Sequence, residues 1–220
     1  MIAENIQAIR SRIGDRTRLI AVSKTKPAAD IEEAYRAGQK VFGENKVQEM
    51  CEKYERLPKD IEWHMIGHLQ SNKVKYMAPF VAMIHGVDSL KLAGEISRQA
   101  VRHQRTIPCL LQIHIAEEET KFGFAPGELD TLLRDTDMAR LPGIRWSGVM
   151  GMATFTGDTE KIRKEFRHLY QIFTGLRLSY FKNEPAFSEI SMGMSSDWPL
   201  AVEEGSTLIR VGSAIFGDRT

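Results

Sequence analysis

The chain has 220 residues, of which 42% are hydrophobic and 27% are charged, and this composition is typical of an ordinary globular protein. Thirty lysine and arginine residues stand against 29 acidic residues, and the formal net charge is +1. Without a strong positive charge, the composition does not favour binding to nucleic acid or to an acidic membrane surface, and a small molecule is the expected partner.

The first predicted element is a helix at about residues 1–13, in which isoleucines repeat at helical spacing on one face. Charged residues interrupt this segment, unlike the apolar core of a signal peptide, and no apolar stretch approaches the ~18 residues that span a bilayer. The two cysteines, Cys51 and Cys109, lie far apart and indicate no disulfide framework. We therefore expect a soluble protein of the cytoplasm.

Eight short apolar segments bounded by turn residues follow, and each is predicted to form a strand. Helical patterns lie between them. The clearest are a helix at 158–179, with Asp158 as its cap, and a helix that begins at Asp88 and Ser89. The predicted strands span residues 18–24, 39–44, 61–67, 80–87, 108–115, 144–151, 186–193 and 206–213.

The alternation of strands and helices predicts an α/β fold with a parallel sheet. An open doubly wound sheet has the same local pattern as a closed TIM-like (β/α)8 barrel, and the count of eight strands favours the barrel. No linker, repeat or low-complexity segment interrupts the chain. We therefore expect residues 1–220 to form a single domain.

Lys24 closes the first predicted strand and shares one face of it with Ile20 and Val22. Catalytic and binding residues of α/β barrels lie at the carboxyl ends of the strands. Burial and the positive charge of nearby Lys26 would both lower the pKa of Lys24, and a neutral amine can form a Schiff base with an aldehyde. Alternatively, Lys24 is structural and extends along the rim into solvent. The strand alone does not distinguish the two interpretations.

The loops after the seventh and eighth strands form the usual phosphate site of such barrels. The segment SMGMSSD supplies hydroxyl groups and a glycine, and LIRVGSAIFG places an arginine before small residues that let backbone N–H groups approach an anion. Each loop by itself is more typical of an ordinary Gly/Ser turn or helix cap, so only their convergence on one rim favours a site. The candidates are Ser191, Gly193, Ser195, Arg210, Gly212 and Ser213.

Other motifs give weaker signals. Asn45 follows the second strand, where a rim ligand and a helix cap are comparable interpretations. His64 and His68 have HxxxH spacing, but they fall on a strand and its loop without a nearby carboxylate, so we expect no metal site. Neither a GxGxxG motif nor a P-loop is present, so nucleotide binding has no motif support.

Six segments, spread over essentially the whole chain, together resemble the YggS/PROSC-type pyridoxal phosphate (PLP) homeostasis proteins. This resemblance is more specific than any single motif above, because it combines order and spacing. The segments are AVSKTKP (21–27), FGENKVQE (42–49), WHMIGHLQSNK (63–73), ETKFGF (119–124), SMGMSSD (191–197) and STLIRVGSAIFG (206–217).

The resemblance implies a PLP-binding barrel similar to the N-terminal domain of alanine racemase, the type III fold of PLP proteins. It implies that Lys24 is the Schiff-base lysine and that Arg210 faces the pyridine nitrogen. The chain departs from the family at Trp198 and Pro199, which affects the seventh helix and the contribution of Ser196 or Asp197 near the phosphate. The implied phosphate cradle consists of Ser191, Ser195, Gly212 and Ser213, and Asn45 and Gly193 complete the expected cofactor contacts.

PLP catalysis works best when a carboxylate keeps the pyridine nitrogen protonated, and Arg210 would oppose that. The resemblance therefore implies a monomeric protein without catalytic residues that holds PLP and supplies it to apo-enzymes. The leading alternative is an enzyme that uses Lys24 on the same barrel, either an amino-acid racemase or a lysine Schiff-base aldolase. A third alternative, an interaction scaffold, predicts no chromophore.

Overall fold

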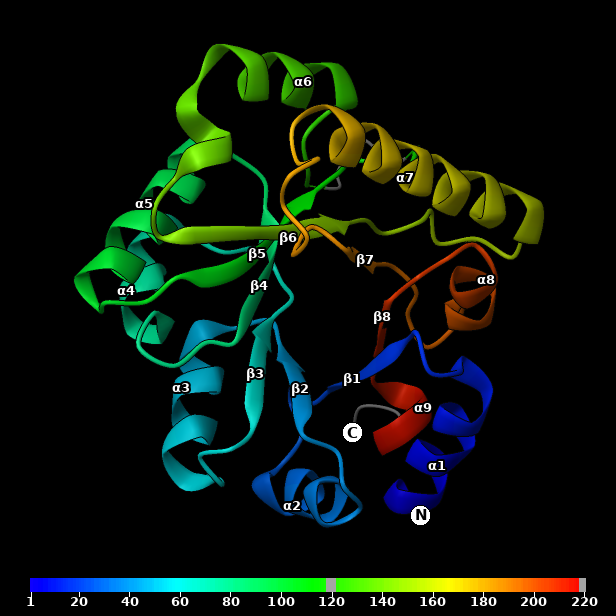
Figure 1. Ribbon diagram of the computed structural model, residues 1–220. Coiled ribbons are helices and arrows are strands. Elements are labelled where there is room, and N and C mark those ends of the chain that lie inside the picture. The colour runs from blue at the N-terminus through cyan, green and yellow to red at the C-terminus, as the bar shows by residue number, and fades with distance from the viewer. Residues whose placement is uncertain (118–121, 218–220) are drawn as a thin grey trace.

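Eight parallel strands close into a barrel in sequence order, with β8 paired to β1 (Figure 1). The structure is a computed structural model that describes residues 1–117 and 122–217. The barrel confirms the predicted TIM-like fold, and each predicted strand overlaps one observed strand, although β5 begins one residue before its predicted range. The strands are β1 (Arg18–Val22), β2 (Val41–Glu44), β3 (Glu62–Met65), β4 (Met83–Val87), β5 (Ile107–Gln112), β6 (Ile144–Met150), β7 (Glu189–Ser191) and β8 (Leu208–Val211).

Helices surround the strands in a ring (Figure 1). Helix α1 buries four isoleucines, as the sequence pattern predicts. Ser89 caps α5 by accepting a hydrogen bond from Leu92 N, and Asp158 caps α7 by accepting one from Lys161 N. Within the described residues, no helix is long and apolar enough to cross a membrane. The helices are α1 (Ile2–Ile13), α2 (Ala28–Arg36), α3 (Val47–Arg56), α4 (Val74–Met77), α5 (Leu90–Arg102), α6 (Pro126–Asp135), α7 (Thr159–Ser179), α8 (Trp198–Glu203) and α9 (Ser213–Phe216), with 3₁₀ turns η1 (Ser71–Lys73) and η2 (Asp137–Arg140).

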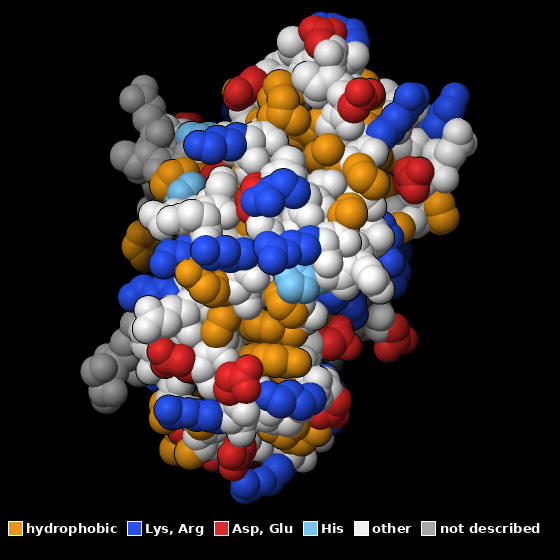
Figure 2. Space-filling view, turned by 90° about the vertical axis from the view of Figure 1, so that its left-hand side faces the viewer, with side chains coloured by type: hydrophobic (Ala, Val, Ile, Leu, Met, Phe, Trp, Pro, Cys, Tyr) orange, Lys and Arg blue, Asp and Glu red, His pale blue; other side chains and the backbone are white. Residues whose placement is uncertain are grey.

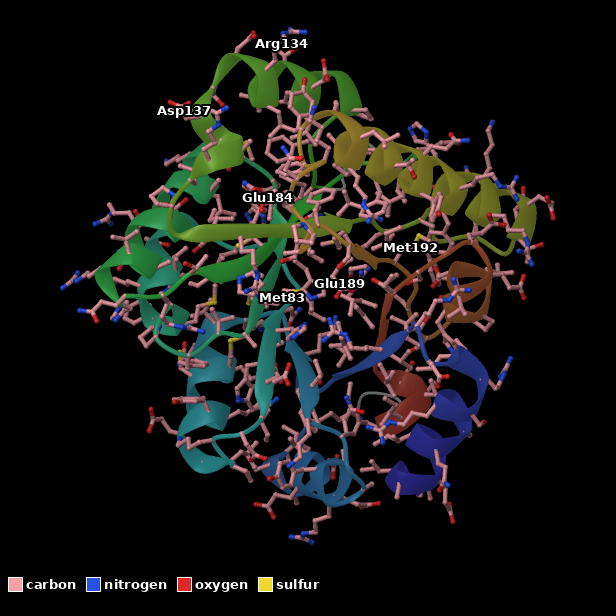
Figure 3. All side chains as sticks on the ribbon, viewed as in Figure 1. Met83, Arg134, Asp137, Glu184, Glu189 and Met192 are labelled. Carbon is pink, nitrogen blue, oxygen red and sulfur yellow. The ribbon has the colours of Figure 1, made fainter. Side chains whose placement is uncertain are left out.

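Alternation along the strands separates two apolar clusters. In β1, Leu19 and Ala21 belong to the large cluster that packs the strands against the helices, whereas Ile20 belongs to a small cluster inside the barrel. Figure 3 labels one member of the inner cluster, Met83 of β4, which lies within the ring of strands. Burying each large aliphatic side chain contributes about 1.5–3 kcal/mol. The inner cluster, which fills the barrel interior, is Ile20, Met83, Leu110, Met150 and Leu208.

The helix after β7 forms despite the departure at Trp198 and Pro199. Helix α8 is only six residues long, and Pro199 stands in its first turn, where the missing N–H has no intrahelical partner to lose. Trp198 is buried, and the guanidinium of Arg12 lies 4.8 Å from the centre of its ring. The unusual sequence therefore gives a short helix that packs against α1.

Basic and acidic side chains alternate on the surface. Figure 2 shows one face of the molecule, on which short rows of lysine and arginine side chains are interspersed with carboxylates and apolar side chains. This mixture matches the formal net charge of +1.

Candidate functional site

A cavity of about 570 Å³ opens at the carboxyl ends of the strands. Its size falls within the usual range of sites for small molecules and cofactors. The loops after β1, β2, β7 and β8 contribute most of the predicted candidates to its lining. The predicted residues that line it are Lys24, Asn45, Ser195, Arg210, Gly212 and Ser213.

Lys24 lies in the turn that follows β1 and lines the cavity together with Val22. Ile20, two positions before Val22 on the same face of β1, belongs to the inner cluster below, so the predicted alternation is observed for Ile20 and Val22. The strand ends at Val22, however, so Lys24 does not close the strand as predicted but lies beyond it in the turn. Lys26 also lines the cavity, and its Nζ donates a hydrogen bond to the Phe216 carbonyl at 3.2 Å. Two lysine side chains therefore reach the same cavity from one turn.

Arg210 follows the same alternation on β8. Leu208 belongs to the inner cluster, and Arg210 and Gly212 line the cavity above it. Arg210 is buried, and its Nη2 donates to the Gly151 carbonyl at 3.2 Å. Desolvation lowers the pKa of Arg210 to about 10, although Asp197 opposes the shift. The guanidinium therefore keeps its proton at neutral pH and presents only hydrogen-bond donors to the cavity.

A buried chain of hydrogen bonds supports Arg210 from inside the barrel. Arg210 Nη1 donates to Ser191 Oγ at 2.5 Å, and Ser191 Oγ lies 2.8 Å from His85 Nδ1. His85 Nε2 lies 3.0 Å from His64 Nδ1. Because arginine can only donate, every link is satisfied when Ser191 donates to His85 and His85 donates to His64. Both imidazoles are then neutral.

The neutral histidines should make the protein sensitive to acid. Desolvation, assisted by the charge of Arg18, lowers the pKa of His64 to about 3, and desolvation also lowers that of His85 well below its usual value. In the unfolded chain both titrate near pH 6.5. The unfolded state therefore takes up more protons, and the free energy of unfolding should fall as pH drops below 6.5, by about 2 kcal/mol at pH 5 for His64, with His85 acting in the same direction.

Urea denaturation between pH 5 and pH 8 measures this dependence. His64→Gln should reduce the slope of the free energy of unfolding against pH, whereas His103→Gln, which changes an exposed histidine, should leave that slope unchanged. Equal slopes for wild type and His64→Gln would show that His64 is not the titrating group.

The loops after β7 and β8 meet at one wall of the cavity. Gly212 N donates to Ser195 Oγ at 3.1 Å, and Ser213 begins α9 directly afterwards. Asp197 holds the first loop by accepting a hydrogen bond from Met194 N at 2.6 Å. A Cβ atom at Gly212 would lie 3.2 Å from the Val22 carbonyl oxygen, a tight contact, so glycine favours the close approach of this loop to β1. The structure thus brings Ser195, Gly212 and Ser213 together as predicted.

Two predicted residues do not line the cavity. The side chain of Ser191 points into the barrel below it and is occupied by Arg210 and His85. Gly193 faces α8, because a Cβ atom there would lie 2.6 Å from Ala201 Cβ, and its φ of 96° favours glycine. Its carbonyl accepts a hydrogen bond from Arg210 N at 2.9 Å. Both residues therefore contact Arg210 from behind the cavity wall, and neither is among the residues that line the cavity.

The cavity also contains residues that sequence reasoning did not assign to it. His68 and Phe122 stack with ring centres 4.0 Å apart, and His68 Nδ1 lies 3.1 Å from Asp88 Oδ2. Met152 and Met194 contribute apolar surface. The motif ETKFGF contained a signal for Phe122, although its residues 119–121 lie outside the described part of the chain. The other residues follow predicted strands, but nothing in their local sequence distinguishes them from ordinary loop residues.

His64 and His68 occupy separate environments, one inside the barrel and one at the cavity. Across residues 1–117 and 122–217, no three His, Cys, Asp or Glu side chains gather in a geometry that could hold a metal ion.

The fold is that of the alanine racemase barrel. The family model of the alanine racemase N-terminal domain matches residues 1–220, so the chain belongs to this class of α/β barrels. The alanine racemase of Bartonella henselae has a TM-score of 0.73 at 14% identity, and the match covers 99% of this chain and 58% of that one. At that identity the likeness shows the fold alone.

Other relatives are similar along their whole length. The pyridoxal phosphate homeostasis proteins of Aquifex aeolicus and Escherichia coli K12 are 39% and 36% identical to this chain, covering 99% of it and 95% and 94% of their own lengths. The structure of PipY from Synechococcus elongatus with PLP bound has a TM-score of 0.90 at 38% identity, covering 99% of this chain and 100% of that one. The chain belongs to the pyridoxal phosphate homeostasis protein family, as its motifs predicted.

Proposed function

We propose that this protein binds pyridoxal 5′-phosphate as a Schiff base on Lys24 and holds it for delivery to apo-enzymes inside the cell, as a monomer. The observation that carries the proposal is the convergence of an amine, a buried guanidinium and a hydroxyl-rich loop pair on one cavity. Membership in the PLP homeostasis family and the PLP-bound structure of PipY support the same ligand.

The lining residues fit three of the polar groups of PLP: its aldehyde, its pyridine nitrogen and its phosphate. The amine of Lys24 suits the aldehyde, with loss of water as the imine forms. The donors of Arg210 suit the pyridine nitrogen, which can accept a hydrogen bond when it is unprotonated. Ser195, Gly212 and Ser213 suit the phosphate, because hydroxyl and backbone N–H groups donate hydrogen bonds to anions.

The rest of the wall suits the faces of an aromatic ring. Val22, Ile66 and Met152 supply apolar contacts, and the side chain of Asn45 adds a polar group on the side of β2. Sites for cofactors commonly combine an apolar lining with a few polar groups that fix orientation. The cavity of this protein follows that pattern.

Arg210 favours a holder over an enzyme. PLP supplies an electron sink that is strongest when its ring nitrogen is protonated. Desolvation lowers the pKa of Arg210 to about 10, so the guanidinium remains charged at neutral pH. A charged guanidinium cannot accept a hydrogen bond from a protonated ring nitrogen, so Arg210 would favour the unprotonated ring. Carbanions on a bound substrate would therefore gain little stabilisation.

Titration of the purified protein with PLP, followed by borohydride reduction and peptide mapping, tests the binding proposal. We expect a visible absorption band and a reduced adduct on the peptide that contains Lys24. Incubation of the loaded protein with an apo PLP enzyme should restore the activity of that enzyme. Absence of both the band and the adduct would contradict the proposal.

Exchange of the α-hydrogen of amino acids in heavy water separates the holder from the enzyme alternatives. We expect exchange by the loaded protein to be no faster than exchange by free PLP. Rapid exchange that disappears in Lys24→Ala would favour a racemase or aldolase activity instead.

A further inference from the structure

A buried ionic network lies beneath the turn that carries Lys24. Lys53 of α3 donates from Nζ to the Ser23 carbonyl, to Glu44 Oε1 and to Glu49 Oε1, each at 2.7 Å. Ser23 Oγ donates to the same Glu44 oxygen at 2.6 Å. The side chains of Glu44 and Lys53 are 0% and 10% exposed, so the pair is nearly withdrawn from solvent. The network therefore connects the ends of β1 and β2 with α3.

The network is poorly explained by stability alone. Desolvation raises the pKa of Glu44, with Lys53 opposing the shift, and Glu44 Oε2 has no hydrogen-bond partner among the described residues. Buried ion pairs of this kind often contribute little to stability compared with apolar side chains of similar size. The network does, however, fix the backbone on both sides of Lys24.

The turn that carries Lys24 is strained. Lys26 N donates to the Ser23 carbonyl at 3.0 Å and closes the turn, and Thr25 has a φ of 65°, which is uncommon for a β-branched residue. Such conformations persist when surrounding contacts hold them. Here Thr25 N donates to Glu49 Oε1 at 2.6 Å, and the Ser23 carbonyl accepts from Lys53. The backbone before and after Lys24 is thus bonded to the network.

We propose that Lys53 and Glu49 are positioning residues, which hold the strained turn so that Lys24, and not Lys26, reacts with the aldehyde of the cofactor. This inference rests on the proposed function. Both lysines line the same cavity and are two residues apart, so the conformation of the turn decides which amine reaches the reacting carbon. Glu44 completes the network by holding the ammonium of Lys53 and the hydroxyl of Ser23.

The test compares Glu49→Ala with Glu52→Ala, a matched change of an exposed carboxylate on the same helix. Glu49→Ala should weaken PLP affinity about tenfold, because the competent turn is populated less. After borohydride reduction, it should also move part of the adduct from Lys24 to Lys26. Glu52→Ala should match wild type in both measurements. A loss of global stability alone would not change which lysine carries the adduct.

Rescue provides the second arm. Glycine adopts positive φ without strain, so Thr25→Gly in the Glu49→Ala background should restore the affinity and return the adduct to Lys24. The double variant Glu44→Gln/Lys53→Met removes the central charges together, leaves no unpaired buried carboxylate, and should shift the adduct as Glu49→Ala does. Adduct on Lys24 alone in both Glu49→Ala and the double variant, at wild-type affinity, would overturn the inference.

Amide hydrogen exchange separates this inference from the proposed function, because it needs no PLP. The amide of Thr25 should be protected in wild type and should exchange faster in Glu49→Ala, but not in Glu52→Ala. If the Thr25 amide exchanged at the same rate in Glu49→Ala as in wild type, the proposal that Glu49 stabilises the turn would be overturned, even if wild type forms the Lys24 adduct. A wild type that forms no adduct would contradict the proposed function and with it the selection of Lys24.

Discussion

Lys24→Ala is expected to abolish the borohydride-stable PLP adduct while the free energy of unfolding changes by no more than about 1 kcal/mol. The side chain lies in a turn at the cavity and belongs to neither apolar cluster, so its removal leaves the packing of the barrel intact. The phosphate and ring contacts remain, so weak noncovalent binding should persist without the visible band of the imine. Absorption spectra, mass spectrometry of the reduced protein and urea denaturation measure these effects.

Lys26→Ala is the matched control, because it removes the other lysine side chain of the same turn. It should keep the adduct on Lys24. If Lys24→Ala still formed the adduct in wild-type yield, the amine that reacts with PLP would be one other than Lys24. If that variant unfolded, the structural interpretation of Lys24 would be favoured.

PLP is expected to bind at least about a hundredfold more tightly than pyridoxal, which lacks the phosphate. Two charge-assisted hydrogen bonds from the wall of Ser195, Gly212 and Ser213 would suffice, at about 1.5–3 kcal/mol each. Gly212→Val should weaken PLP binding, because the Val22 carbonyl oxygen leaves little room for a side chain. Titrations with both ligands, followed by absorption, give the ratio of affinities.

The two serines provide an internal comparison. Ser195→Ala should reduce the preference for PLP over pyridoxal by about one such charge-assisted hydrogen bond, or at least about tenfold. Ser191→Ala should destabilise the fold by about 1–3 kcal/mol, because it removes the buried hydrogen-bond partner of Arg210 Nη1 and of His85 Nδ1, but it should leave the preference unchanged. The opposite result would place Ser191 in the phosphate site and Ser195 outside it.

The sequence predicted the barrel and most of the cavity because the relevant signals are local. Alternation with a period of two is a property of each strand by itself, so it correctly placed Val22 above Ile20 and Arg210 above Leu208, while Lys24 reaches the same cavity from the turn just beyond β1. The carboxyl ends of parallel strands then necessarily meet at one end of the barrel. Neither inference required knowledge of how distant strands pack.

The buried position of Ser191 could not be read in the same way. Its strand was predicted correctly, but whether a side chain near the strand end reaches the cavity depends on its height in the barrel relative to seven other strands. His85 likewise looked like one polar residue in an apolar strand. Its role emerges only from contacts with β3 and β7.

Glu49 and Lys53 illustrate a different limit. Their spacing of four residues on a helix is typical of an exposed ion pair that contributes a few tenths of a kcal/mol. In the structure, Lys53 is buried against Glu44, and the pair contacts the turn after β1. The spacing alone therefore gives no reason to single out this pair, and only the tertiary fold shows that it contacts the turn that carries Lys24.

The pairing of β1 with β8, with Ile20 opposite Arg210, has a consequence for the order of folding. Lys24 follows the first strand of the barrel and Arg210 belongs to the last, so the cavity wall is assembled from segments separated by nearly the whole sequence. During synthesis on the ribosome, an emerging chain has no complete pocket until its final strand has docked, and this long-range closure is entropically slow. A ligand that contacts both strands binds only the closed barrel, so by mass action it would stabilise the pairing of β1 with β8 against opening.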